Sequence, residues 1–452
     1  MSEPQKKATS PAQQKGVYDA RALGVSKMLI LGLQHTFAMF GATVLVPFLT
    51  GLSVPTTLFC AGIGTLLFHL ITKGKVPAFL GSSFAFLGGI LMVAPKLVDP
   101  ATGEATIPNA EMLPYACGGI VVAGLVYVVM SLLISVFGIQ KVMRFFPPVV
   151  TGPIIISIGL ILAPSAISNC QSNWVLALVA LAIVVACNIW GKGMIKILPI
   201  LLGVIGSYIV ALCMGAVDFS AVREAKAIAF PVVGSQMAKF SLSAILTIVP
   251  ISLATMMEHI GDVAAISATT GKNFIRDPGL NRTLLGDGLA TTIAGFLGGP
   301  ANTTYGENTG VLALSRVYDP KVVRIAAVFA ILLSFSPKFG AIVSTVPAGI
   351  IGGISFILYG MISAIGVRNV VENRVDFTNS RNLIIAAVIL VSALGFNSIG
   401  GLSIVVSSEL TINLSGLAIA AILGILLNAI LPGNDYQFDK VSNTGDSMNF
   451  EI

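Results

Sequence analysis

The sequence predicts an all-α polytopic membrane protein with fourteen transmembrane segments, arranged as seven plus seven inverted repeats. The chain of 452 residues is 55% apolar and only 10% charged, whereas charged residues make up about 25% of an average soluble domain. A soluble protein is excluded, because too few charged side chains remain to cover its surface. The apolar residues gather in runs of about 20, the length that a helix needs to cross a bilayer. The longest polar break, near 218–241, divides the chain almost in half.

Charged or turn-rich breaks separate the apolar runs, and each run is a predicted span. Several runs are short or contain Gly and Pro, so hydropathy alone gives roughly ten to fourteen spans. In the first half the predicted spans lie near 28–51, 54–72, 76–95, 112–138, 145–165, 174–190 and 197–216. In the second half they lie near 242–267, 284–298, 300–315, 322–343, 346–366, 382–397 and 411–432.

The distribution of basic residues favours fourteen spans. With a cytoplasmic N-terminus, this count leaves 21 of the 26 Lys and Arg residues on the cytoplasmic side. The five on the outside are Lys96, Arg223, Lys226, Lys239 and Lys338. Such an excess of positive charge inside is typical of membrane proteins, and removing one early span would reverse the following loops.

These spans predict five regions and a location in the cytoplasmic (inner or plasma) membrane, in contact with lipid. The first 27 residues carry several lysines but lack the features of a secretory signal, so both chain ends are expected in the cytoplasm. The regions are an N-terminal tail (1–27), a first repeat (28–216), an extracytoplasmic connection (217–241), a second repeat (242–432) and a C-terminal tail (433–452).

The third span of each half is interrupted in the same way. Val76–Phe86 and Gly299–Asn308 each have Pro at the entry and Gly in the interior, and both residues disfavour a continuous helix. Paired interruptions at corresponding positions indicate a transporter binding site near the midplane, where protein or a wet cavity satisfies the unwound backbone. Two loop-like stretches without a ligand are the alternative interpretation.

Three acidic residues lie inside predicted spans: Glu258, Asp262 and Glu307. The others fall in tails, loops or at span ends, such as Asp287. A carboxylate at the bilayer centre costs at least about 2.5 kcal/mol, so each of the three is a candidate functional residue. Glu258 and Asp262 share one helix face because they are four residues apart.

A purely structural role for these acids is the alternative. Glu258 and Asp262 would then be satisfied by neighbouring hydroxyls or by His259, and Glu307 by a backbone amide at a helix end. His35 and His259 are candidate proton relays, although a single His on an apolar helix face is more often a hydrogen-bonded core residue.

Other functional classes find no support in the sequence. The five cysteines are scattered, mostly within apolar runs, and their spacing suggests neither disulfides nor a metal site. The basic residues lie in short loops, where they set orientation, so nucleic-acid binding is not expected. Motifs of metalloproteases, nucleotide-binding loops and serine hydrolases are missing, which argues against an enzyme. We expect no cofactor and no metal.

Four motifs in the sequence are Gly81-Ser-Ser-Phe-Ala-Phe86, Glu258-His-Ile-Gly-Asp262, Arg276-Asp-Pro-Gly-Leu280 and Asn302-Thr-Thr-Tyr-Gly-Glu-Asn-Thr-Gly310, the last continuing through Ser315-Arg-Val317. They resemble motifs of the uracil permease branch of the nucleobase/ascorbate transporter family. The likeness runs from about Lys27 to Leu431, and the last motif is specific.

The resemblance implies an architecture and a function. Spans 1–4 and 8–11 would form a core bundle and the other spans a gate bundle, with short antiparallel strands in the interrupted spans (about 76–95 and 300–315). It also implies proton-coupled import of uracil, a nucleobase, by a homodimer joined through the gate bundles. Glu258 and Glu307 would bind the base, Phe84 and Gly306 would offer backbone amides, and Tyr359 would close the pocket.

Two features refine this expectation. The family's purine carriers usually have Gln at the position of Glu307 and no basic residue at that of Arg316, so this pair favours a pyrimidine. Uracil permeases can carry His where this chain has Asp262. The proton-coupling group therefore stays open among Asp262, Glu258 and His35. Tyr305, Asn308 and Arg316 are expected to support the site.

Several alternatives remain at this point. A purine or xanthine symporter would share the family's architecture, and a facilitative nucleobase channel would need no buried acids. Sodium could replace the proton, because carboxylates also bind Na⁺. An intramembrane enzyme would be exposed by product analysis after uptake.

Overall fold

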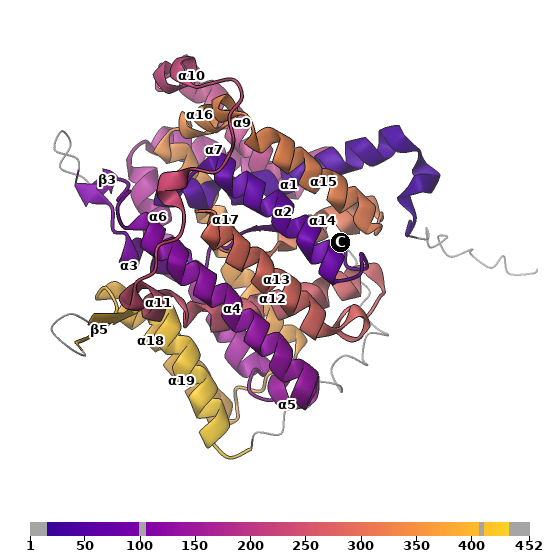
Figure 1. The fold of residues 1–452 in the computed structure, drawn as a ribbon, viewed down its shortest axis with the longest axis vertical. Helices are drawn as coiled ribbons and strands as arrows, with labels where there is room; N and C mark the ends of the chain where they lie inside the picture. The colour runs from indigo at the N-terminus through magenta and orange to yellow at the C-terminus, as the bar shows by residue number, and fades with distance from the viewer. Residues whose placement is uncertain (1–15, 99–104, 406–410, 434–452) are drawn as a thin grey trace, which may run out of the picture.

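The computed structural model describes residues 16–98, 105–405 and 411–433, and these residues are mostly helical (Figure 1). The first half contains η1 (Ala20–Leu23), α1 (Val25–Thr50), α2 (Val54–Ile71), β1 (Leu80–Ser82), α3 (Leu87–Val93), β2 (Leu97–Val98), β3 (Ala105–Ile107), α4 (Leu113–Phe137), α5 (Ile139–Met143), α6 (Pro148–Gln171), α7 (Trp174–Trp190), α8 (Met194–Ile197), α9 (Pro199–Cys213) and α10 (Ser220–Glu224). The second half contains η2 (Gly234–Gln236), α11 (Leu242–Ile248), α12 (Ile251–Thr270), η3 (Ile275–Gly279), α13 (Leu280–Phe296), β4 (Asn302–Thr304), α14 (Gly306–Ser315), α15 (Pro320–Ser334), α16 (Pro337–Ser344), α17 (Ala348–Glu372), α18 (Ser380–Ser398), β5 (Leu402–Val405), β6 (Thr411–Leu414) and α19 (Gly416–Ile430).

Within the described residues, seven helices are long and apolar enough to cross a membrane, counting α11 and α12 as one. An eighth results if α15 and α16, which meet at an angle of 88°, form one bent span. Three further apolar helices, α7, α9 and α19, are shorter. The chain is therefore a multi-pass membrane protein, and helix length alone does not establish fourteen spans.

Short polar side chains define where several of these helices begin. The side chains of Ser53, Asn173 and Ser415 accept hydrogen bonds from backbone N–H groups in the first turns of α2, α7 and α19. Asp319 and Asn379 do the same for α15 and α18. Such caps satisfy N–H groups that have no partner inside the helix.

The contacts between helices recur in pairs. Helix α4 packs on α13 as α2 packs on α15, and α7 packs on α9 as α18 packs on α19. Helix α17 contacts α7 as α6 contacts α18, and α6 and α17 pack on each other. The helices can be numbered as the predicted spans in chain order, with α1 in span 1 and α11–α12 in span 8. Each contact between two spans then recurs between the two spans that lie seven places away in the numbering. Two repeats related by a two-fold axis would produce this pattern.

The two interrupted segments meet at the centre of this arrangement. Strands β1 and β4 pair antiparallel, with Leu80 opposite Thr304, Gly81 opposite Thr303 and Ser82 opposite Asn302. Helix α3 follows β1, and helix α14 follows β4. Both strands are buried. Their backbone groups pair with each other, as unwound backbone inside a membrane requires.

The helices form two groups that pack most closely within themselves, and α1 and α12 of one group also contact α6, α9 and α19 of the other. We call α1–α4 with α11–α15 the core bundle, and α6–α9 with α17–α19 the gate bundle. Three segments of the chain join the bundles: α5, the stretch with α10 and η2, and α16, which is bent by 88° from α15. Two of them, α5 and α16, are hydrogen-bonded to the gate bundle at their ends. Asn428 of α19 donates to the carbonyl of Arg144 after α5 (3.1 Å), and the hydroxyls of Tyr208 of α9 and Thr345 after α16 lie 2.6 Å apart.

The end of the predicted N-terminal tail packs against the core bundle. The N–H of Val17 donates to Arg316 O (2.8 Å), and the Tyr18 hydroxyl donates to Thr270 O (2.6 Å). Helix α1 begins at Val25, slightly before the predicted first span. Residues 1–15 and, apart from Gly433, the predicted C-terminal tail lie outside the described residues.

Candidate functional site

Each interrupted segment places the start of a short helix beside the paired strands. Tyr305 is the N-cap residue of α14, and Phe86 is the N-cap residue of α3. Neither side chain accepts a hydrogen bond from the N–H groups of the helix that follows it. The first four N–H groups of a helix have no partner within it, and together they carry a partial positive charge. The start of α14 therefore offers N–H donors near the β1–β4 pair, whereas the first N–H of α3, at Leu87, donates to Phe84 O (3.0 Å).

Helix α12 brings the carboxylate of Asp262 to the start of α14. Helix α12 contacts both β4 and α14, and Glu258 and Asp262 are half-buried on it, one turn apart. Asp262 Oδ1 lies only 3.6 Å from where a Cβ on Gly306 would be. A carboxylate at a helix N-terminus is electrostatically favourable. Hydrogen-bond acceptors of α12 thus lie next to the N–H donors of α14.

Two of the predicted residues follow Gly306 directly on α14. The backbone of Glu307 lies in the first turn, but its side chain is outside the described part of the structure. Asn308 is buried, and its Nδ2 lies 3.0 Å from His35 Nδ1 and donates to His35 O (3.2 Å). Asn308 therefore joins α14 to α1, and His35 lies at that contact.

Tyr305 connects the two interrupted segments. Its hydroxyl donates to the backbone oxygen of Ser82 (2.9 Å) and lies 3.2 Å from the Ser82 hydroxyl. Thr43 of α1 donates to the same hydroxyl (3.3 Å). This predicted supporting residue thus holds β1 and α1 together beside the start of α14.

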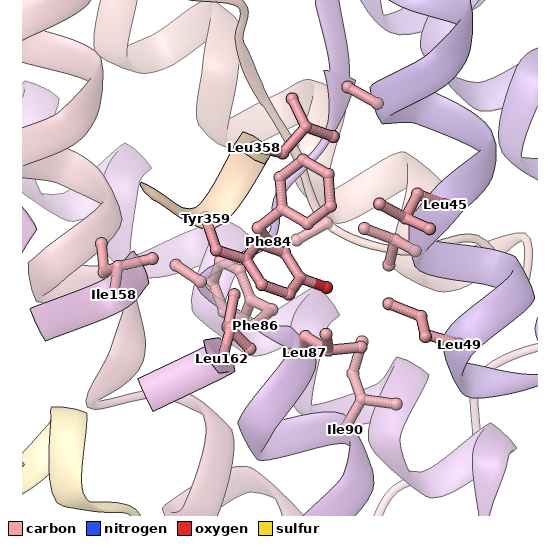
Figure 2. Close-up of a cluster of buried hydrophobic side chains, with 14 of the residues drawn as sticks. Leu45, Leu49, Phe84, Phe86, Leu87, Ile90, Ile158, Leu162, Leu358 and Tyr359 are labelled. Atoms are coloured by element: carbon pink, nitrogen blue, oxygen red, sulfur yellow. The ribbon is translucent and has the colours of Figure 1, made fainter. Parts of the chain in front are cut away.

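Phe84 and Tyr359 meet where the core bundle faces the gate bundle. Their ring centroids are 5.8 Å apart at an interplanar angle of 75°, an edge-to-face contact. Figure 2 shows both rings within a cluster of apolar side chains, with the Tyr359 hydroxyl directed toward Leu45 and Leu49 of α1. That hydroxyl is buried without a hydrogen-bond partner among the described residues.

A cavity of about 10 Å³ borders Phe84 between α3 and α6. This volume holds about one water molecule, so it does not accommodate a planar ring. A ring-sized ligand beside Phe84 needs more space than this cavity provides.

Arg316 is the predicted supporting residue that lies outside this cluster. It is exposed and caps the opposite end of α14 in a left-handed conformation (φ 53°). The ten residues of α14 place it about 15 Å along the helix axis from Gly306.

Sequence reasoning missed a buried acidic residue, Asp287. The sequence places it at a span end, whereas the structure buries it fully inside α13. Asp287 Oδ2 lies 3.2 Å from His259 Nδ1, which is also 2.6 Å from the Thr304 hydroxyl of β4. The prediction was wrong because α13 begins at Leu280, earlier than the predicted span. The hydrophilic stretch Arg282-Thr-Leu-Leu-Gly-Asp-Gly288 conceals this start.

A model of the permease family matches residues 26–399. The chain belongs to this family. It is 42% identical over 422 residues to a protein named uracil permease from Bacillus caldolyticus, covering 90% of this chain and 93% of that protein. It is 37% identical over 427 residues to the uracil permease of Escherichia coli (strain K12), covering 91% and 94%. The resemblance to the uracil permease branch is confirmed, and these relatives are named permeases, not enzymes.

Solved structures share the fold at low sequence identity. The transmembrane domain of a cyanobacterium bicarbonate transporter, BicA, superposes with a TM-score of 0.65 at 16% identity, covering 86% of this chain and 99% of that domain. SLC26A9 has the same TM-score at 11% identity, covering 91% of this chain and 66% of that protein. This chain therefore shares its fold with proteins that have little sequence identity to it.

Proposed function

We propose that this permease imports uracil across the cytoplasmic membrane together with protons. The observation that carries the proposal is the position of the Asp262 carboxylate of α12 at the start of α14. Relatives of 37–43% identity that are named uracil permeases support uracil as the substrate.

Uracil is a neutral ring that presents N–H donors beside carbonyl acceptors. Glu258 and Glu307 accept hydrogen bonds from the ring N–H groups, and the backbone amides of Phe84 and Gly306 donate to its oxygens. Tyr359 closes the pocket from the gate bundle. An unmatched polar group in such a site costs about 1–3 kcal/mol, which allows it to reject similar rings.

Proton coupling needs a group whose protonation changes during transport. Asp262, Glu258 and His35 are the candidates. Asp262 borders Gly306 at the start of α14, and His35 Nδ1 lies 3.0 Å from Asn308 Nδ2 in the first turn of the same helix. Asp287 with His259 is a further buried pair that touches β4. Measuring uracil accumulation by variants of these residues identifies the group that carries the proton.

The proposed architecture has fourteen spans with both termini in the cytoplasm. The spans are α1, α2, β1–α3, α4, α6, α7 and α9, then α11–α12, α13, β4–α14, α15–α16, α17, α18 and α19. The paired helix contacts and the distribution of basic residues support this count. A homodimer through the gate bundles completes the proposal, following the family resemblance.

The decisive experiment measures uptake of labelled uracil by cells that express the protein, in competition with a panel of nucleobases. We expect pyrimidines to compete and purines not to compete. A proton ionophore should abolish accumulation, and replacing Na⁺ by choline should leave it unchanged. Competition by xanthine instead of uracil would overturn the substrate. Uptake that equilibrates without accumulating would indicate a facilitator.

A further inference from the structure

We propose that Asn302, the first residue of β4, is the positioning residue that fixes the substrate-binding start of α14. Its side chain is almost fully buried (1% exposed), and Nδ2 donates to the carbonyl of Cys60 in α2 (3.0 Å). The Thr291 hydroxyl of α13 donates to the backbone oxygen of the same residue (2.7 Å). Asn302 is thus held from two helices that belong to opposite halves of the chain.

The contact with α2 depends on the missing side chain of Gly64. A Cβ at Gly64 would lie 2.4 Å from Asn302 Nδ2, well inside the usual contact distance, and 3.0 Å from the Cβ of Ala290. Gly64 is one turn after Cys60, so its own N–H is the normal helical partner of the Cys60 carbonyl. The Asn302 amide uses the second acceptor position of that carbonyl, which only a glycine leaves accessible.

This anchoring has a direct consequence for the site. Tyr305 and Gly306 follow Asn302 by three and four residues, and α14 begins at Gly306. A shift of Asn302 away from α2 therefore moves the N–H donors of α14 relative to Asp262 and Glu258 of α12. The role rests on the proposed function, because it sets the geometry in which uracil is bound. Asn302 acts through the backbone and does not itself touch the base.

The test measures uracil binding to the purified protein by calorimetry, which gives both the Kd and the number of sites. Asn302→Asp replaces the donor by an acceptor facing the Cys60 carbonyl, and we expect uracil affinity to fall about tenfold. Thr291→Val keeps the shape and removes the second hydrogen bond, so a smaller loss in the same direction is expected. The number of sites should not change, whereas misfolding would reduce it.

A double-mutant cycle isolates the contact between Gly64 and Asn302. Gly64→Ala should weaken uracil binding in the wild-type background, because its new methyl group collides with the Asn302 side-chain amide. The Asn302→Ala background lacks that amide, so Gly64→Ala should weaken binding much less there. The contact with Ala290 is present in both backgrounds and cancels. Gly395→Ala on α18, where a Cβ meets nothing within 4 Å, is the matched control and should bind normally.

The outcomes separate this inference from the proposed function. Wild-type protein that binds no uracil would overturn the function. If the wild type binds uracil while Asn302→Asp and Thr291→Val bind it equally well, Asn302 has no positioning role and the function stands. Equal effects of Gly64→Ala in both backgrounds would also overturn the role of Asn302.

Discussion

Asp262 and Glu258 share one face of α12, but the carboxylate of Asp262 borders Gly306 at the start of α14. This contact suits a group whose charge alters the position of α14. We expect Asp262→Asn, which imitates the protonated acid, to bind uracil and exchange it across the membrane but to lose proton-driven accumulation. Exchange and net uptake are measured in the same proteoliposomes. Normal accumulation by well-folded Asp262→Asn protein would exclude the coupling role and direct attention to Glu258 or His35.

The pair of His259 and Asp287 has no exposure to solvent, whereas Lys75 and Asp277 form an ion pair whose side chains are 42% and 68% exposed. Leaving a buried polar group without its partner costs about 1–3 kcal/mol, and an exposed ion pair contributes about 0–1 kcal/mol. Asp287→Ala should therefore lower the melting temperature in detergent far more than Asp277→Ala. Equal losses in the two variants would contradict a stabilising role for the buried pair.

At the scale of elements, the interrupted segments could be predicted because Pro and Gly weaken helices locally, as at Pro77 and Pro300. The pairing of β1 with β4 could not be derived from local pattern, since it joins residues more than two hundred positions apart; only the family resemblance implied strands there. For the same reason, the hydrogen bond from Asn302 to the Cys60 carbonyl could not be predicted from the sequence. Candidate acids inside long apolar runs were found, but Asp287 was missed where the start of its helix is hydrophilic.

The linkers between the bundles lead to an element-scale prediction. Gly138 precedes α5 at φ 83° and ψ 153°, and Gly24 before α1 has nearly the same conformation, φ 81° and ψ 159°. A Cβ at either position meets nothing within 4 Å, so alanine causes backbone strain of about 1–3 kcal/mol at both.

Only Gly138 lies between the core and gate bundles. We expect Gly138→Ala to lower the maximal rate of uracil uptake at unchanged uracil Kd, and Gly24→Ala to leave the rate unchanged. Uptake kinetics and equilibrium binding on the same preparations distinguish the two variants. A loss of rate in both would point to general destabilisation and away from a hinge at Gly138.

At the scale of the whole molecule, the paired helix contacts place β1 and β4 on the axis that would relate the two repeats. In transporters built in this way, alternating access comes from movement of one bundle against the other around a central site. The edge-to-face contact of Phe84 with Tyr359 lies between the two bundles, so a movement of this kind would change it.

The energetics of the complete cycle provide the last prediction. Uracil is neutral, so import with one proton carries one positive charge inward, worth about 2.3 kcal/mol per 100 mV of membrane potential. At equilibrium, 100 mV alone would support an accumulation of about fiftyfold, because each 1.4 kcal/mol is a factor of ten. We therefore expect uptake into sealed vesicles to respond to an imposed potential even when no pH gradient is present, and to increase further when the outside is acidified. A potassium gradient with valinomycin sets the potential, and buffers of equal pH on both sides of the membrane keep the pH gradient at zero. Uptake that ignores both gradients would rule out proton symport while leaving uracil recognition by the α12 and α14 site intact.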